Sequence, residues 1–124
     1  MESNNKHVAI LGASTNPERY AYQAQKLLME KGYNIYPINP NYEQIQNIIC
    51  YKKITEVAND IDTLTVYMNP EKLELLLPEI LIKKPKRIIL NPGSESEKIK
   101  TELNSRNITV LEACTLVLLK TGQF

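Results

Sequence analysis

The sequence is poor in cysteine and histidine, and it contains no long hydrophobic run. Its two cysteines, Cys50 and Cys114, are too few for a disulfide framework and lack the C-x-x-C spacing, which predicts free thiols in a reducing compartment. No segment approaches roughly 18 uninterrupted apolar residues, so no membrane span is expected. The opening MESNNKHVAI has neither the long apolar stretch nor the cleavage site of a signal peptide. We therefore expect a cytoplasmic protein without a metal site.

An excess of charge of one sign is also lacking. Fifteen basic and fourteen acidic residues give a formal net charge of +1, so the overall balance favours neither nucleic acid nor an anionic membrane as a partner. An anionic ligand would have to be held by local groups. The length of 124 residues and the hydrophobic content of 43% fit one compact domain over residues 1–124.

The hydrophobic pattern alternates between short strand-like runs and helical stripes. Five runs are typical of buried parallel strands: 8–11, 34–38, 63–68, 87–90 and 108–111. The expected helices run from Pro17 or Tyr20 to Lys31, from Pro70 with a break at Pro78, from a capping-box spacing at Ser94 to Glu97, and over 115–120. Within 42–60, where boundaries are not evident, Ile45, Ile48 and Ile49 suggest one helical turn and 54–58 another. The order predicts an α/β fold with a five-stranded parallel sheet and helices on both faces.

Four Asn-Pro steps follow the first four predicted strands. They are Asn16-Pro17, Asn39-Pro40, Asn69-Pro70 and Asn91-Pro92. The carboxyl ends of parallel strands share one edge of a sheet, where open α/β sheets bind ligands, so all four steps belong to one candidate binding edge. Asparagine before proline also suits a helix start, so capping and ligand contact both stay open for Asn16 and Asn69. Asn39 and Asn91 precede no obvious helix, and we expect them to contact a ligand.

The stretch LGASTNPERY, after the first predicted strand, suits a phosphate better than a dinucleotide. Gly12 allows a close backbone approach, Ser14 adds a hydroxyl donor, and Arg19 can bind a phosphate through two hydrogen bonds. The dinucleotide fingerprint needs three glycines here and an acidic residue at the end of the second strand, where this sequence has Ile38-Asn39-Pro40. Ordinary NAD binding is therefore not expected.

These motifs resemble those of the small CoA-binding domain family, which is similar to the CoA-binding N-terminal domain of the succinyl-CoA ligase alpha subunit. The resemblance runs from about His7 to Cys114 and is carried by GASTNPERY, YPINP, DIDTLTVYMNP, KPKRIILNPG and EACTLVLLKTGQF. It implies a Rossmann-like three-layer sandwich that binds coenzyme A or an acyl-CoA and has no agreed reaction of its own. The residues that it implies at the cofactor are Gly12, Ala13, Ser14 and Arg19 along the phosphates, Asn39 and Pro40 at the adenosine, Met68, Asn69 and Pro70 near the adenine or the pantetheine arm, and Asn91, Pro92 and Gly93 on the far side of the crevice.

Two departures from the family pattern fall at these positions. Family members often carry a lysine just after the Asn-Pro step of the second strand, where this chain has Asn41, so the 3′-phosphate of CoA lacks its expected cation. Many also have an aromatic residue and a glutamine at the end of the fourth strand, replaced here by Leu90, Asn91 and Pro92.

No catalytic constellation is evident. The ligase reaction passes a phosphoryl group through a histidine of a further domain, whereas the single histidine here, His7, stands at the entrance to the first strand, so we do not expect that reaction. Cys114 is either a small buried hydrophobe or, if the pantetheine thiol reaches it, the site of a mixed disulfide in a redox-responsive CoA carrier or sensor. Tyr20 and Tyr67 are candidates for stacking on an adenine, with apolar packing as the expected role of each.

Three functions remain open at this stage. The motifs favour non-enzymatic binding of CoA or an acyl-CoA. The alternatives are a Rossmann-type enzyme that uses NAD(P) or a nucleotide-linked substrate, and a regulatory module that senses acyl-CoA through a partner protein. The apolar tail from Leu116 to Phe124 either packs on its own domain or forms the contact of a homodimer.

Overall fold

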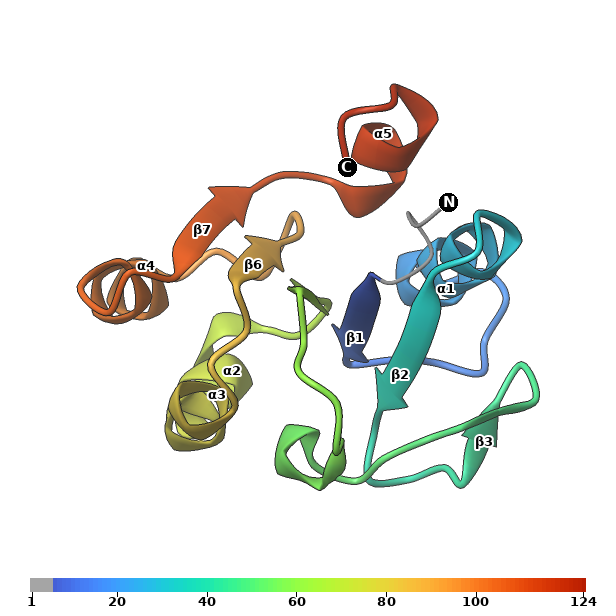
Figure 1. Ribbon diagram of the computed structural model, residues 1–124, viewed down its shortest axis with the longest axis horizontal. Helices are drawn as coiled ribbons and strands as arrows, with labels where there is room; N and C mark the ends of the chain where they lie inside the picture. The colour runs from blue at the N-terminus through green and yellow to red at the C-terminus, as the bar shows by residue number, and fades with distance from the viewer. Residues whose placement is uncertain (1–5) are drawn as a thin grey trace.

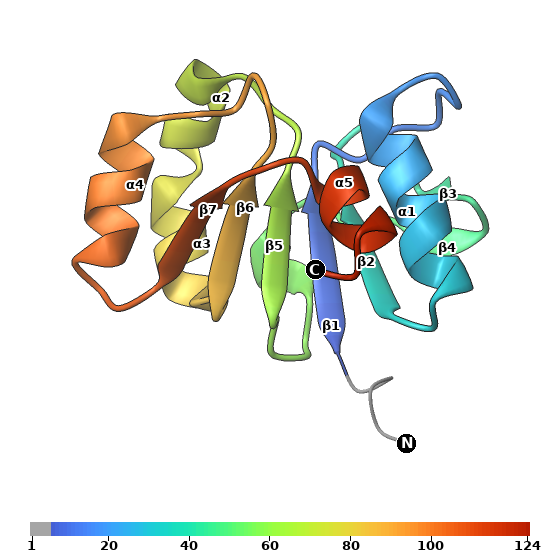
Figure 2. The ribbon, with the colours of Figure 1, turned by 90° about the horizontal axis from the view of Figure 1, so that it is seen from above.

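The computed structural model describes residues 6–124. Five parallel strands form one sheet in the order β2-β1-β5-β6-β7, and their arrowheads all point to the same edge (Figure 2). The strands are β1 His7–Leu11, β2 Asn34–Ile38, β5 Thr63–Val66, β6 Arg87–Leu90 and β7 Thr109–Glu112. The prediction of a five-stranded parallel sheet is confirmed, with every strand within two residues of its expected bounds.

Helices cover both faces of the sheet, as expected for a three-layer sandwich (Figure 1). On one face lie α1 Tyr20–Glu30 and α5 Thr115–Lys120, which contact each other. The opposite face is covered by α2 Pro70–Leu75, α3 Leu77–Lys83 and α4 Glu97–Asn104. The apolar tail therefore packs on its own domain through Leu116 and Leu119, both buried.

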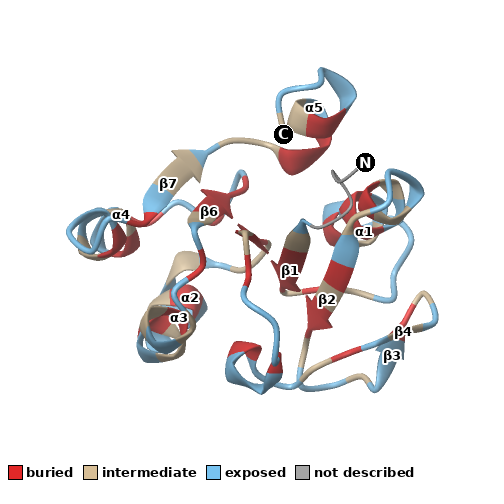
Figure 3. Ribbon diagram, in the orientation of Figure 1, coloured by how far each residue is buried: buried red, intermediate tan, exposed pale blue. Residues whose placement is uncertain are grey.

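The alternation of side chains along each strand divides the core into two clusters. Val8 and Ile10 of β1 pack toward α1 and α5, whereas Ala9 and Leu11 pack toward the other helices. Most of the central sheet is buried, while β7 at the edge keeps exposed residues at both of its ends (Figure 3). Such continuous burial explains why the strand sequences are apolar at nearly every position.

Helix α1 begins later than its Asn-Pro step suggests. Its N-cap is Arg19, and the Asn16 side chain accepts the Glu18 N–H at 3.0 Å. Of the two roles left open for Asn16, capping of this helix is therefore wrong, and ligand contact stays a prediction. The inward face consists of Ala21, Ala24, Gln25 and Leu28. Tyr20, expected to pack inward, is 68% exposed.

The remaining helix starts follow local chemistry. Asn69 caps α2 by accepting the Lys72 N–H at 2.9 Å, which confirms its capping role. Pro78 stands in the first turn of α3, so the predicted helix is divided in two. Helix α4 begins two residues beyond the expected Ser94 capping box, because Ser96 accepts the N–H of Ile99 at 3.2 Å.

Residues 42–60 differ most from the prediction. Instead of a helical turn, β3 Gln44–Ile45 and β4 Ile48–Ile49 form a short antiparallel hairpin. Its two connecting residues, Gln46 and Asn47, both have positive φ, which is the requirement of a tight hairpin turn. A single 3-10 turn, Ile54–Glu56, accounts for the second predicted turn.

None of the helices within residues 6–124 has the length and apolarity that a membrane crossing requires.

Candidate functional site at the carboxyl edge of the sheet

The order in which strands are added to the sheet changes side at β1. Strand β2 lies on one side of β1 and β5 on the other, so the crevice beyond the ends of β1 and β5 is the topological switch point, where sheets of this kind bind ligands. Gly12 and Tyr67 meet at this point, with the Tyr67 N–H bonded to the Leu11 carbonyl at 2.9 Å. Gly12 has φ +86°, and a Cβ there would collide with the Tyr67 carbonyl oxygen. Only glycine suits this position.

Asn39 joins the loops that follow β1 and β2. Its Nδ2 donates to the Ala13 carbonyl at 2.8 Å, and its Oδ1 accepts the Asn41 N–H at 2.9 Å. The N–H groups of Gly12 and Ala13 both point to the Ile38 carbonyl, at 3.1 and 3.3 Å. The half-buried Asn39 therefore holds the two loops together, and these two amides are already engaged.

The N-terminus of α1 is the open polar end at this edge. The Arg19 side chain caps nothing and has no partner within residues 6–124, and none of the first-turn residues of α1 is acidic. The first N–H groups of a helix have no intrahelical acceptor and carry partial positive charge. Ser14 lies close by along the chain, and its Oγ accepts the Asn16 N–H at 3.0 Å, which leaves its proton available for donation.

At two other helix starts on the same edge, a side-chain cap and an acidic residue already interact with the free N–H groups. Helix α2 has the Asn69 cap and Glu71 in its first turn, and α4 has the Ser96 cap and Glu97. An acidic side chain in the first turn neutralises the partial positive charge there. Helix α5 also starts at this edge without an acid in its first turn, but its first N–H, that of Thr115, is bonded to Asn91 Oδ1. Of these four helix starts, α1 therefore suits an anion best.

Asn91 belongs to the framework beneath the edge. It is 2% exposed. Its Nδ2 donates to Thr65 Oγ1 at 2.7 Å and to the Val66 carbonyl at 2.9 Å, and its Oδ1 accepts the Thr115 N–H at 2.8 Å. The side chain thus ties β5 to the start of α5, and both of its amide atoms are engaged within the chain. The ligand contact expected of Asn91 stays a prediction.

The other predicted residues lie along the rim with differing accessibility. Met68 and Pro70 are half-buried, and Asn69, Pro40, Pro92 and Gly93 are exposed. The Met68 N–H donates to Ser94 Oγ at 3.0 Å, and the Gly93 N–H donates to Glu95 Oε1 at 2.9 Å. These contacts fix the loops after β5 and β6 without covering them.

Cys114 is the N-cap residue of α5 and carries a half-buried free thiol. Nearby, the Tyr67 hydroxyl is buried and makes no hydrogen bond with a described residue. Burial raises the pKa of Tyr67 to about 12; the neighbouring hydroxyls of Thr115 and Thr65 act in the opposite direction, and Cys114 raises it further. Tyr67 is therefore a neutral phenol at pH 7 with a buried hydroxyl.

Comparison with known proteins identifies the family. The sequence profile of the CoA binding domain matches residues 6–120. This chain belongs to the CoA-binding domain family. The fold is shared as well, because the crystal structure of an uncharacterized protein superimposes with a TM-score of 0.91 and 34% identity over 97% of this chain and 98% of the other.

Larger enzymes contain a segment similar to this CoA-binding domain. An acetate–CoA ligase [ADP-forming] of Methanocaldococcus jannaschii is 41% identical over 76 residues, which cover 61% of this chain but 10% of the ligase. The uncharacterized protein YneT of Bacillus subtilis is 28% identical over 76 residues, covering 61% of this chain and 56% of YneT. A dinucleotide forming acetyl-coenzyme A synthetase 1 of Ca. Korarchaeum cryptofilum shares the fold, with a TM-score of 0.73 at 22% identity, over 87% of this chain and 25% of that one.

One cation of this CoA-binding domain was missed by the sequence patterns. Lys52 follows the hairpin, and its Nζ donates to the carbonyl of Pro40 at 3.3 Å, next to Asn41. The hairpin folds 42–50 back on itself, so an ammonium group from the following segment reaches the loop after β2. Residues 40 and 52 are brought together by that turn and by the pairing of Tyr51 with Ile38 at the end of β2. Neither contact has a helical or strand periodicity in the sequence to reveal it.

Neither a metal centre nor a histidine belongs to this edge. The described part of the chain holds no group of three or more histidine, cysteine, aspartate or glutamate residues arranged for a metal. His7 lies at the opposite end of the sheet, where its Nδ1 is 2.7 Å from the Tyr36 hydroxyl, in agreement with the prediction that it stands away from the candidate site.

Proposed function

We propose that the carboxyl edge of the sheet binds coenzyme A or an acyl-CoA, and that residues 1–124 act as a binding domain without a reaction of their own. The observation that carries this proposal is the uncapped, acid-free N-terminus of α1, beside Ser14 and Arg19. It provides backbone N–H groups, a hydroxyl proton and a guanidinium, which together suit a pyrophosphate. The ligases similar to this chain bear CoA in their names.

The rest of the cofactor would follow the rim. We place the adenosine at Asn39 and Pro40, the adenine or the pantetheine arm at Met68, Asn69 and Pro70, and the far wall at Pro92 and Gly93. Because the Asn39 and Asn91 side chains are engaged within the chain, they shape this path, and contacts to the cofactor would come from backbone groups and from the half-buried Met68 and Pro70.

An NAD(P) ligand fits this edge less well. A dinucleotide needs a carboxylate at the end of β2 to accept its ribose hydroxyls. Here the neutral Asn39 stands at that point with both amide atoms occupied. The same location supports CoA in another way, since Lys52 supplies a cation one residue from Asn41. We propose that Lys52 pairs with the 3′-phosphate.

Cys114 would meet the far end of the cofactor. The CoA thiol would be able to reach it along the rim, and CoA disulfide would then exchange with the Cys114 thiolate to form a protein–CoA disulfide and release one CoA thiolate. Incubation with CoA disulfide should add the mass of one CoA to the wild-type chain. An equal adduct on Cys114→Ser would overturn this part of the proposal, because the buried Cys50 would then be the reacting thiol.

A ligand panel tests the proposed function. Thermal unfolding is followed with CoA, acetyl-CoA, NAD, NADP and ATP, for the wild type, Arg19→Gln and the exposed-lysine control Lys26→Gln. CoA at about 100 times its Kd should stabilise the wild type by about 2.7 kcal/mol, a shift of several degrees, and the shift should shrink in Arg19→Gln alone. A shift with NAD or NADP and none with CoA or acetyl-CoA would refute the proposal.

A further inference from the structure

A second polar hollow lies at the opposite, amino-terminal edge of the sheet. It has a volume of about 450 Å³ and is bordered by the starts of β1, β5, β6 and β7. A five-residue strand spans about 17 Å, so this hollow is well separated from the proposed CoA edge. Three of its lining side chains, Lys6, Lys86 and Arg87, are cationic, and one, Asp62, is acidic.

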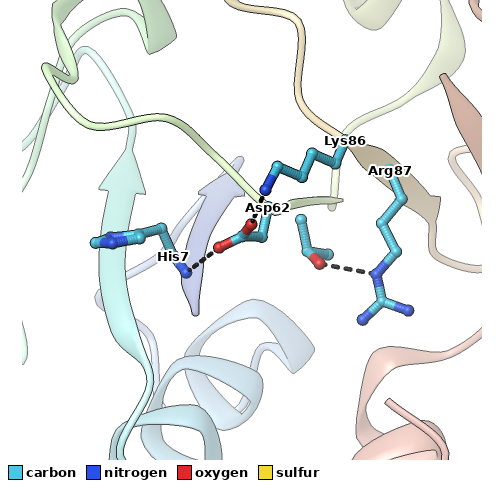
Figure 4. A network of polar contacts seen from close by, with 5 residues as sticks. His7, Asp62, Lys86 and Arg87 are labelled. Atoms are coloured by element: carbon cyan, nitrogen blue, oxygen red, sulfur yellow. Dashed lines mark hydrogen bonds and ion pairs between the residues drawn. The ribbon is translucent and has the colours of Figure 1, made fainter. Parts of the chain in front are cut away.

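The one acid is not available to Arg87. Asp62 accepts the His7 N–H at 2.8 Å and pairs with Lys86 at 3.1 Å. Figure 4 shows Arg87 reaching away from this pair. Its neighbours are neutral: Nε donates to Thr63 Oγ1 at 2.8 Å, and the guanidinium carbon lies 4.6 Å from the centre of the Phe124 ring.

Within the described residues, Arg87 is thus a half-buried cation that pairs with no acidic side chain. Its side chain is only partly open to solvent, and this burial lowers the pKa of its guanidinium. Within residues 6–124 the terminal nitrogens have neither a hydrogen-bond partner nor an ion pair. An unpaired, partly desolvated charge is costly, and an anion in the hollow would offset that cost.

A role at a helix end does not explain this arginine. Lys83, in the last turn of α3, complements the partial negative charge of that helix. Arg87 is the first residue of β6 and faces a hollow between strands. Its position is therefore that of a ligand anchor rather than of a helix-end cation.

The hollow also has apolar lining residues, namely Val8, Leu111 and Phe124. A guanidinium presents paired donors that match the two oxygens of a carboxylate, and the exposed Lys6 adds charge. We propose that this hollow binds a small carboxylate with an apolar body, anchored by Arg87.

Benzoate is a suitable probe, because it combines a carboxylate with a flat apolar body, and benzamide is its neutral counterpart. Titration into the ¹⁵N-labelled chain should shift the Arg87 Nε–H signal and the amides of Thr63 and Thr109. Arg87→Gln should weaken benzoate binding about tenfold or more. Lys26→Gln, on the exposed side of α1, should leave it unchanged. If Arg87→Gln fails to fold, Lys6→Gln carries the test, with a weakening of about threefold.

Three results would overturn the proposal. One is equal binding of benzamide and benzoate, and another is the absence of any shift at Arg87 with millimolar benzoate. The third is a shift of the same signals with protein concentration alone, which would assign the hollow to a second copy of the chain. Saturating CoA should leave the benzoate shifts in place, so failure of this proposal and failure of CoA binding at the other edge are distinguishable.

Discussion

At the carboxyl edge of the sheet the side chains of Asn39 and Asn91 are engaged in hydrogen bonds within the chain, whereas at the amino edge the half-buried Arg87 pairs with no acidic side chain among residues 6–124. Asn39 and Asn91 lock loops and strands to one another. Arg87 touches a hydroxyl and an aromatic ring. Both edges hold cations, but at the carboxyl edge Arg19 and Lys52 stand beside a frame of neutral hydrogen bonds, whereas at the amino edge the cation Arg87 is itself part of the hollow.

This difference separates the residues that hold the shape of a site from the charged groups that attract its ligand. At the carboxyl edge, the rim residues that hold the loops should matter for stability, while affinity should depend on Arg19, Lys52 and the start of α1. At the amino edge, the cation itself should decide binding. Substitutions can therefore test each edge by whether they change folding or affinity.

The largest effect is expected for Gly12→Ala. The new Cβ would strike the Tyr67 carbonyl oxygen and would lie 3.0 Å from the Tyr67 carbonyl carbon. In addition, the φ of +86° at residue 12 already disfavours alanine. We expect a loss of about 3 kcal/mol in the free energy of unfolding, or roughly 12 °C in Tm. Calorimetry of the apo protein measures it.

Gly93→Ala is the matched control for that substitution. Gly93 also has a positive φ, of +96°, but nothing lies within 4 Å of a Cβ there. Only the backbone strain remains, so the loss should be about 1 kcal/mol. Equal losses at the two glycines would show that the close approach of β1 and β5 is unimportant.

A smaller loss of stability is expected for Asn91→Ala. The truncation leaves the buried Thr115 N–H without its acceptor and removes one of the donors to the Val66 carbonyl, which costs about 2 kcal/mol. Asn69→Ala, which removes an exposed helix cap, should cost about 1 kcal/mol. Urea unfolding with an unchanged m-value measures both. A negligible loss for Asn91→Ala would mean that its bonds do not support the edge.

Much of the fold was open to prediction from sequence, because the strands are buried on both faces and appear as continuous apolar runs. The edge at which the Asn-Pro steps gather followed from the parallel order of those runs. The two-residue strands β3 and β4 were not predictable, since a pair of residues has no periodicity. Asn16 and Asn69 precede proline alike, but α1 begins four residues after Asn16, and only Asn69 becomes a cap.

The hydrogen-bond partners of the site residues could not be predicted from the sequence, for a different reason. Asn91 bonds Thr115, 24 positions away, and Asn39 bonds Ala13, 26 positions away. Such contacts depend on how the loops meet in three dimensions, whereas local patterns reach only a few residues. The same limit concealed Lys52 beside Pro40 and the pairing of Asp62 with Lys86 instead of Arg87.

Lys52→Gln tests whether a positive charge, rather than the shape fixed by the hydrogen-bonded loops, selects the ligand at the carboxyl edge. If Lys52 pairs with the 3′-phosphate, its loss should raise the Kd for CoA about fivefold, or about 1 kcal/mol, and leave the Kd for dephospho-CoA unchanged. Titration calorimetry at low salt measures both ligands. The exposed neighbour Lys53 provides the control Lys53→Gln. If Lys52→Gln raised the Kd for CoA and for dephospho-CoA equally, Lys52 would not belong to the phosphate site. The same conclusion would follow if Lys53→Gln raised the Kd for CoA as much as Lys52→Gln does.

The smallest effect concerns Asp62, the paired acid of the amino edge. Burial raises the pKa of its carboxyl. The hydrogen bonds from the His7 N–H and Lys86 lower the pKa by more than burial raises it, so the net shift is downward. A lowered folded-state pKa stabilises the protein above the unfolded value of about 3.9, and this stability is lost as the pH falls through the folded value.

Asp62→Asn should therefore cost no more than about 1 kcal/mol at pH 7, and its unfolding free energy should converge with that of the wild type in acid. Urea titrations between pH 7 and pH 2 measure this, with the exposed Asp60→Asn as control. If the difference between Asp62→Asn and the wild type persisted below both pKa values, the carboxylate would be stabilising through something other than its charge. The ion pair would then no longer explain why Asp62 is not available to Arg87.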